Sequence, residues 1–283
     1  MTKQVLMTGL MMAAATGAQA ESKGRVLVIV SSENRMALQD GKSYLTGYYL
    51  NELTVPVRAV MENGYDVTFA NPRGNTPSMD EHSDTPSLFD NNLARYEDYR
   101  RFHASLVGLK KPRILSQVIR EGLEKFDAVF FPGGHAPMID LLENPDVHAA
   151  LKHFHARGKP TAAICHGPIS LLAALPNASE VVAALRARDF EGATRLSQGW
   201  IYADYQMTVF STAEERVAEA NQLGGKVQFY PDEALRTAKG QVRSASPWQS
   251  HAVRDRELIT GQNPFSDEEL AELLLQALAE RAK

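Results

Sequence analysis

The sequence contains a single cysteine, Cys165, so no disulfide can form within the chain. Basic residues form no run and do not alternate with aromatic residues, and the formal net charge is −4, so nothing predicts binding to nucleic acid. Neither a Gly-x-Gly-x-x-Gly loop nor a Walker loop is present, which argues against a nucleotide cofactor. The histidines lack the spacing typical of metal ligands, so we expect no metal and no other cofactor. A small molecule or a protein remains open as a partner, and so does a homodimer.

The N-terminus has the pattern of a cleavable signal peptide. Lys3 supplies a positive charge, residues 5–17 are apolar or small, and Ala18-Gln19-Ala20 has the small-x-small form that signal peptidase cuts. We therefore predict a signal peptide at residues 1–20, cut after Ala20, and a periplasmic or secreted mature protein. An uncleaved N-terminal anchor is the alternative. No later apolar run is long enough to span a bilayer, so the mature form is expected to make no membrane contact.

Strand patterns alternate with helix patterns from residue 21 to residue 283, which predicts a single α/β domain. Such alternation is typical of a three-layer sandwich with a central, mostly parallel sheet of the flavodoxin-like kind. Residues 73–112 are irregular and carry several aromatic side chains, so we expect a partly helical excursion there. The pattern predicts strands at 25–32, 65–72, 127–132, 161–164 and 206–210, helices at 114–126, 147–157 and about 212–223, and a hairpin at 251–261.

Cys165 lies where a strand pattern meets a helix pattern. Residues 161–164 are small or β-branched, and Gly167-Pro168 opens an apolar helical pattern. Helix N-terminal amides and a neighbouring imidazole lower the pKa of a thiol, so we expect a low pKa for Cys165 beside His166. The alternative is that Cys165 is an inert, buried apolar residue.

Two further stretches attract attention as candidate site segments. Proline is tolerated near a helix start, and glycine often caps a helix end, so we predict a helix that begins near Pro56 and is capped by Gly64. Glu52 is then expected just ahead of this helix. Gly133 and Gly134 follow the strand predicted at 127–132, and paired glycines at that end of a strand let backbone N–H groups converge on a ligand. A tight turn without function is the alternative for these glycines.

Four stretches in the same order, 46–52, 131–141, 163–168 and 258–264, resemble motifs of the PfpI family. This family belongs to the class I glutamine amidotransferase-like superfamily. The pattern is most similar to the branch of heat-shock chaperones and glutathione-independent glyoxalases (glyoxalase III), and the similarity spans most of the chain beyond residue 20.

The resemblance implies a nucleophile elbow with Cys165 as the nucleophile and His166 beside it. Glu52 matches an acidic residue that the family places next to the thiol. Burial and the neighbouring negative charge would raise the pKa of Glu52 and keep it protonated as a hydrogen-bond donor or general acid and base. An exposed glutamate without function is the alternative.

A third group is needed to orient the imidazole, and Glu215 matches the family's position for it. Glu214 is the alternative, because either Ser211 or Thr212 could cap the helix that follows and would engage a different glutamate. The resemblance also implies that backbone N–H groups of Gly134 and His166 bind an oxyanion.

His135, next to these glycines, is either a catalytic group, or a histidine that lies at the surface or only supports the catalytic groups. The residues then favour three classes of function. The first is a cofactor-free enzyme that converts small reactive carbonyls, such as methylglyoxal to lactate. The second is a cysteine hydrolase of peptides or amides, and the third is a stress-response holding chaperone or redox sensor.

Overall fold

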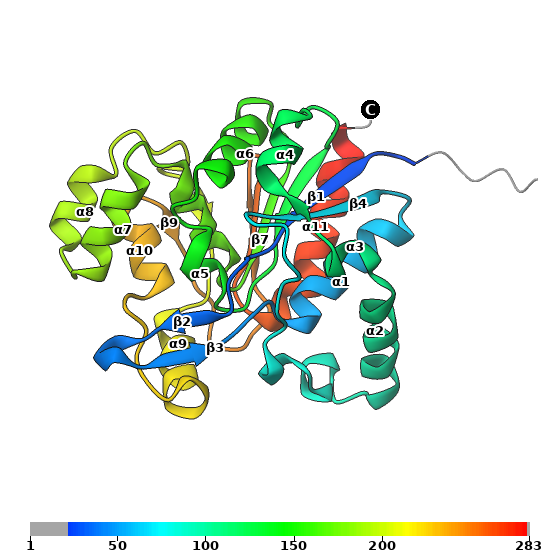
Figure 1. The fold of residues 1–283 in the computed structure, drawn as a ribbon, viewed down its shortest axis with the longest axis horizontal. Coiled ribbons are helices and arrows are strands. Elements are labelled where there is room, and N and C mark those ends of the chain that lie inside the picture. The colour runs from blue at the N-terminus through cyan, green and yellow to red at the C-terminus, as the bar shows by residue number, and fades with distance from the viewer. Residues whose placement is uncertain (1–21, 282–283) are drawn as a thin grey trace, which may run out of the picture.

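The central feature of the fold is a sheet of seven strands in the order β10-β11-β7-β6-β1-β4-β5 (Figure 1). The computed structural model describes residues 22–281, so the predicted signal peptide at 1–20 lies outside the described residues. Neighbouring strands are parallel except for the β10–β11 hairpin. The strands are β1 (Arg25–Ile29), β4 (Asp66–Asn71), β5 (Arg113–Ile114), β6 (Ala128–Phe131), β7 (Thr161–Ile164), β10 (Ala252–Asp255) and β11 (Leu258–Gly261).

Helices cover both faces of this sheet, which makes the predicted three-layer α/β arrangement (Figure 1). On one face α1 (Leu50–Glu62) packs against α11 (Asp267–Arg281), and on the other α4 (Leu115–Arg120) packs against α6 (Pro145–Ala156). Because both faces are covered, β6 and β7 are buried along their whole length and are apolar throughout except for Thr161. The prediction of a mostly parallel central sheet is confirmed.

Smaller elements lie on two sides of the central sheet (Figure 1). Residues 73–112 are partly helical, as expected, with 3₁₀ turns at Glu81–Ser83 and Pro86–Phe89, α2 (Leu93–Ser105) and α3 (Val107–Lys110). A second group lies on the opposite side in Figure 1 and holds α7, α8, α10 and the β8–β9 pair. The remaining bounds are β2 (Arg35–Ala37), β3 (Ser43–Leu45), α5 (Pro137–Asp140), α7 (Ala178–Arg186), α8 (Phe190–Leu196), β8 (Gln206–Met207), α9 (Thr212–Ala218), α10 (Pro231–Thr237) and β9 (Gln241–Val242).

The start predicted for the first helix is wrong. Helix α1 begins at Leu50, so Pro56 lies inside it and Glu52 belongs to its first turn. The N-terminus is fixed from outside, because the Leu50 N–H donates to Ser83 Oγ at 2.9 Å. The contacts of the buried helix outweigh the hydrogen bond that proline removes. The predicted end is correct, since Gly64 follows the helix with φ 89°.

Two other boundaries differ from the sequence expectation. Ile114 is not helical but pairs with Asn71 in β5, and α4 ends at Arg120, because Gly122 takes a left-handed φ of 97°. The strand predicted at 206–210 is reduced to β8, which pairs with β9 outside the central sheet.

Candidate active site

Cys165 occupies a sharp turn directly after β7. The turn leads into η4 (Gly167–Ala174), a 3₁₀ helix, at the position where the pattern predicted the start of a helix. The backbone of Cys165 is left-handed, with φ 59°, which is strained for a residue with a side chain and is common at functional sites. Hydrogen bonds hold it there: its N–H donates to Gly261 O at 2.9 Å, and its carbonyl accepts from Phe210 N at 3.0 Å.

The imidazole of His166 lies between the thiol and a carboxylate. His166 Nδ1 is 3.3 Å from Cys165 Sγ, and His166 Nε2 is 2.7 Å from Glu215 Oε2. Since Glu215 accepts the Nε2 proton, Nδ1 presents a lone pair to the thiol. The three side chains therefore form a buried relay in which His166 can take the thiol proton.

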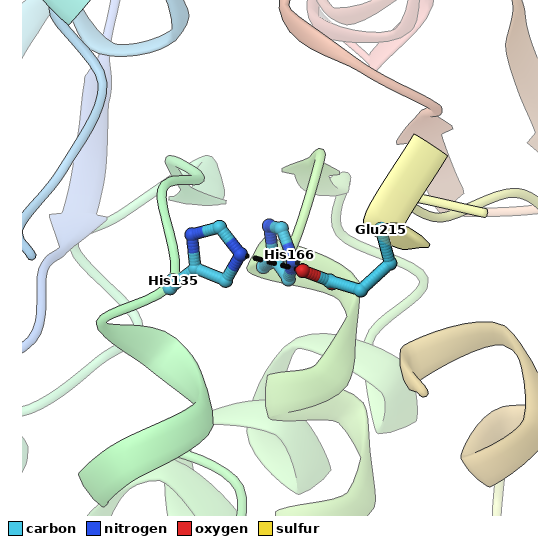
Figure 2. Close-up of side chains that lie close together, drawn as sticks. All are labelled: His135, His166 and Glu215. Carbon is cyan, nitrogen blue, oxygen red and sulfur yellow. Dashed lines mark hydrogen bonds and ion pairs between the residues drawn. The ribbon is translucent and has the colours of Figure 1, made fainter. Parts of the chain in front are cut away.

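His135 is hydrogen-bonded to the second oxygen of the same carboxylate (Figure 2). Its Nε2 is 2.8 Å from Glu215 Oε1, and its ring lies 3.9 Å from that of His166, centroid to centroid. Sequence reasoning placed His135 near the pocket but missed this bond. Glu215 therefore orients two imidazoles, one with each carboxyl oxygen.

The start of α9 explains why Glu215 faces the histidines. Ser211 is the N-cap, and Glu214 closes the capping box by accepting from the Ser211 N–H at 3.0 Å. Glu215 is left free to point toward His166 and His135. Of the two alternatives that the sequence left open, the structure brings Glu215 to the imidazole and assigns the cap to Glu214.

Charge follows from burial in this cluster. Burial, and then the neighbouring His135, lower the pKa of His166 to about 4, so its imidazole is neutral at pH 7. Burial alone would raise the pKa of Glu215. The N–H groups and partial positive charge of the two histidines outweigh burial and hold this pKa well below its usual range. A neutral imidazole beside a carboxylate is suited to accept a proton, because the carboxylate stabilises the positive charge of the imidazolium that forms.

Glu52 is the second acid at the thiol. It is fully buried in the first turn of α1, and neither carboxyl oxygen has a hydrogen-bond partner. Burial raises the pKa of Glu52 to about 8, and the proximity of the Cys165 thiol and the Gly134 N–H offsets only part of that rise. The side chain is thus a protonated acid at neutral pH, the state expected from the sequence.

The low pKa expected for Cys165 is wrong for this arrangement. Burial raises the pKa of the thiol well above its usual value, and the negative charge of an ionised Glu52 would raise it further. The Gly134 N–H lowers the pKa of the thiol but does not outweigh burial. The sequence could not show how deeply the thiol is buried. It therefore predicted too large a lowering of the thiol pKa by the helix start and the neighbouring imidazole.

Gly133 and Gly134 make room for this cluster. A Cβ on Gly133 would lie 2.3 Å from Glu52 Oε2 and 2.6 Å from Cys165 Cβ. Gly134 has φ 79°, and a Cβ there would lie 2.1 Å from Gly47 O. The two glycines therefore let β6, β7 and α1 bring their side chains into contact, and the Gly134 N–H lies at the thiol as an oxyanion donor would.

A cavity of about 470 Å³ opens above the thiol. Cys165, His166 and His135 line it, and the excursion at 73–112 contributes to its wall. None of its lining residues is a lysine, arginine, aspartate or glutamate. Residues that the sequence analysis did not single out complete the lining; they are Tyr49, Phe210, Ala218, Asn221, Gln222, Trp248, Pro264 and Phe265, with His82, Thr85, Ser87 and Leu88 from the excursion.

Three side chains of the site could ligate a metal. One atom each of His135, His166 and Glu215 lies within 4.8 Å of the others. Both carboxyl oxygens already accept hydrogen bonds from the imidazoles, at 2.8 Å and 2.7 Å, so a metal ion would have to displace those protons.

Among residues 22–281, no helix is both long enough and apolar enough to cross a membrane.

These features define an α/β protein with a buried cysteine at a sharp strand-to-helix turn, flanked by an imidazole–carboxylate pair and a protonated glutamate. The chain belongs to the ThiJ/PfpI family: the family described as ThiJ/PfpI family-like matches residues 44–218. This confirms the family that the four motifs indicated.

The similarity to individual proteins extends over most of the chain. A Staphylococcus aureus protein named Protein/nucleic acid deglycase HchA is 27% identical over 267 residues, which are 93% of this chain and 82% of that protein. Two solved structures share the fold. They are the Rapid Encystment Protein 24 KDa of Francisella tularensis (TM-score 0.67, 24% identity, 90% of this chain and 99% of that chain) and glyoxalase III from Candida albicans (TM-score 0.64, 20% identity, 91% and 98%).

Proposed function

We propose that this protein is a cofactor-free cysteine enzyme that acts on 2-oxoaldehydes, converting methylglyoxal to lactate. The observation that carries the proposal is the placement of one thiol between a neutral imidazole and a buried carboxyl group. A thiol can add to an aldehyde, and two groups that hold and release protons on either side can then move a proton between adjacent carbons. The similarity to a named deglycase supports the same class of substrate.

The first step makes the nucleophile and the hemithioacetal. His166 Nδ1 takes the Cys165 proton, and the sulfur forms a bond to the aldehyde carbon. The negative charge that develops on the aldehyde oxygen is stabilised by the Gly134 N–H and by the protonated Glu52, and the oxygen is protonated. Glu215 stabilises the imidazolium in the meantime, because its carboxylate accepts the Nε2 proton.

The second step moves a proton along the substrate. A base at the site, neutral His166 or ionised Glu52, removes the proton from the carbon bonded to sulfur, and the neighbouring carbon is protonated in turn. The product is a thioester of lactate on Cys165. Water then cleaves the thioester, which releases lactate and restores the thiol, so that one methylglyoxal and one water give one lactate.

The test is turnover by the purified chain without glutathione and after treatment with a metal chelator. We expect methylglyoxal to disappear and lactate to appear in equal amounts, followed by proton NMR. Small amides and fluorogenic peptides serve as the comparison substrates. Cleavage of these while every 2-oxoaldehyde is untouched would overturn the proposal in favour of a cysteine hydrolase.

A second candidate is release of the carbonyl from its early adducts on amines or thiols. The name of the Staphylococcus aureus relative, Protein/nucleic acid deglycase, supports this candidate. The cavity of about 470 Å³ favours it, since a small oxoaldehyde alone would leave most of that volume empty. Starting the reaction from a preformed hemithioacetal of methylglyoxal with an excess of a scavenger for free aldehyde separates the two candidates.

A further inference from the structure

Two aromatic side chains lie exposed at the mouth of the cavity. Trp248 and Phe265 line the cavity and are 37% and 40% exposed, the most exposed tryptophan and phenylalanine among residues 22–281. Exposing such side chains costs free energy, because large apolar surfaces are stabilised by removal from water. Their exposure at the entrance to the thiol therefore indicates that these two side chains have a function there.

One buried carboxyl group fixes the backbone at Trp248 directly and at Phe265 through Asn263. Glu214 Oε1 accepts from the Trp248 N–H at 2.8 Å and from Asn263 Nδ2 at 2.8 Å. Asn263 Oδ1 accepts in turn from the Phe265 N–H at 2.9 Å. Glu214 is fully buried, and these bonds fix the two loops relative to α9.

The backbone of Trp248 is strained. Its φ is 65°, in the left-handed region that a bulky side chain rarely adopts. Glycine would take this conformation without strain, yet tryptophan occupies the position, and Glu214 accepts a hydrogen bond from its backbone N–H. A cost of this kind is typical of a residue whose side chain is needed at one place.

Aromatic rings connect this rim to the thiol. The Trp248 ring meets Phe210 edge to face, with centroids 5.7 Å apart, and Phe210 lies 4.6 Å from the His166 ring. A ligand whose carbonyl reaches Cys165 would place its next atoms along this wall. Since no lysine, arginine, aspartate or glutamate lines the cavity and this wall is aromatic, the wall suits an uncharged apolar group.

We propose that Trp248 and Phe265, fixed by Glu214, form a subsite for an aryl group attached to the reactive carbonyl, so that aryl 2-oxoaldehydes are preferred to methylglyoxal. This deepens the proposed function and rests on it. Rings pack edge to face or offset against a bound aryl group, which adds to the burial of apolar surface. Glu214 acts here as a positioning residue, because it touches the loops and not the ligand.

The experiment compares phenylglyoxal with methylglyoxal at several concentrations. We expect kcat/KM of the wild type to be at least tenfold higher for phenylglyoxal. In Trp248→Gly, which removes the ring and relieves the backbone strain, kcat/KM for phenylglyoxal should fall at least tenfold more than that for methylglyoxal, mainly through KM. Trp248→Phe should restore most of the preference, and Val107→Ala, at an exposed site on α3 outside the cavity, should change neither value.

Equal losses for both substrates in Trp248→Gly, or no preference in the wild type, would overturn the subsite. If the wild type turns over neither substrate, the proposed function fails, and the subsite is tested separately by calorimetric titration with acetophenone. The subsite predicts binding that is at least tenfold weaker in Trp248→Gly than in the wild type. Equal affinity of the two proteins for acetophenone would refute it.

Discussion

Replacing Glu52 by glutamine should change how the stability of the protein depends on pH. The pKa of Glu52 is raised from its ordinary value of 4.5 to about 8 by burial. The folded state therefore binds this proton more tightly than the unfolded chain does. The sign follows: the contribution is fully present below about pH 4.5 and is lost as the pH rises toward about 8.

The size of the effect can be worked out from the pKa shift. One pKa unit corresponds to about 1.4 kcal/mol, so the free energy of unfolding of the wild type should fall by about 3 kcal/mol between pH 5.5 and pH 8 through this one group. Glu52→Gln cannot ionise and lacks this dependence. Asp267, whose pKa burial raises to about 7, acts in the same direction but is present in both proteins and largely cancels in the difference.

The assay is urea unfolding of the wild type and Glu52→Gln at pH 5.5, 7 and 8. We expect the stability advantage of the wild type over the variant to shrink by about 3 kcal/mol over this range. Glu97→Gln, at an exposed position on α2, is the matched control and should follow the wild type at every pH. Parallel curves for the wild type and Glu52→Gln would refute the account of a protonated, buried Glu52.

Other predictions concern the relay, the glycine and the N-terminus. Glu215→Gln should lower kcat at least a hundredfold for methylglyoxal in a steady-state assay, because the amide cannot accept both Nε2 protons or stabilise an imidazolium. Gly133→Ala should lower the free energy of unfolding by several kcal/mol in urea titrations, since its Cβ would overlap Glu52 Oε2 and Cys165 Cβ. We also propose export, for which N-terminal sequencing of protein from fractionated cells should find Glu21 first.

Each of these has its own contradicting result. A kcat within threefold of the wild type in Glu215→Gln would remove that residue from the mechanism. Gly108→Ala lies in α3, where a Cβ comes no closer than 3.3 Å to Phe69, so it should fold normally; equal stability of the two glycine variants would contradict the steric argument. A cytosolic protein that keeps Met1 would contradict export.

Much of the fold was predictable because the strands are short runs of apolar residues between helix patterns. The position of the elbow followed from residues 161–168 alone. The start of α1 was not predictable, because Ser83, distant in sequence, caps Leu50 and lets the helix run through Pro56. The exclusion of β8 from the central sheet is likewise a tertiary effect, which local patterns do not carry.

The site was predictable in its residue types but not in its charges. Family motifs pointed to Cys165, Glu52 and Glu215, and the capping pattern left Glu214 open as the alternative to Glu215. The sequence does not reveal that Glu215 accepts hydrogen bonds from two imidazoles or that burial raises the pKa of the thiol; the structure shows both. The rim that Trp248 forms lies in a stretch without regular secondary structure, where sequence periodicity gives no signal.

The most direct test of the central claim is the turnover of 2-oxoaldehydes by Cys165→Ala beside the wild type. The substitution removes one sulfur atom from a buried site and leaves the histidines and both acids in place, and circular dichroism with urea unfolding checks that the fold is retained. If Cys165 is the nucleophile, lactate formation from methylglyoxal falls to the rate without protein while the folded state persists. Lactate formation at the wild-type rate by folded Cys165→Ala would contradict the account.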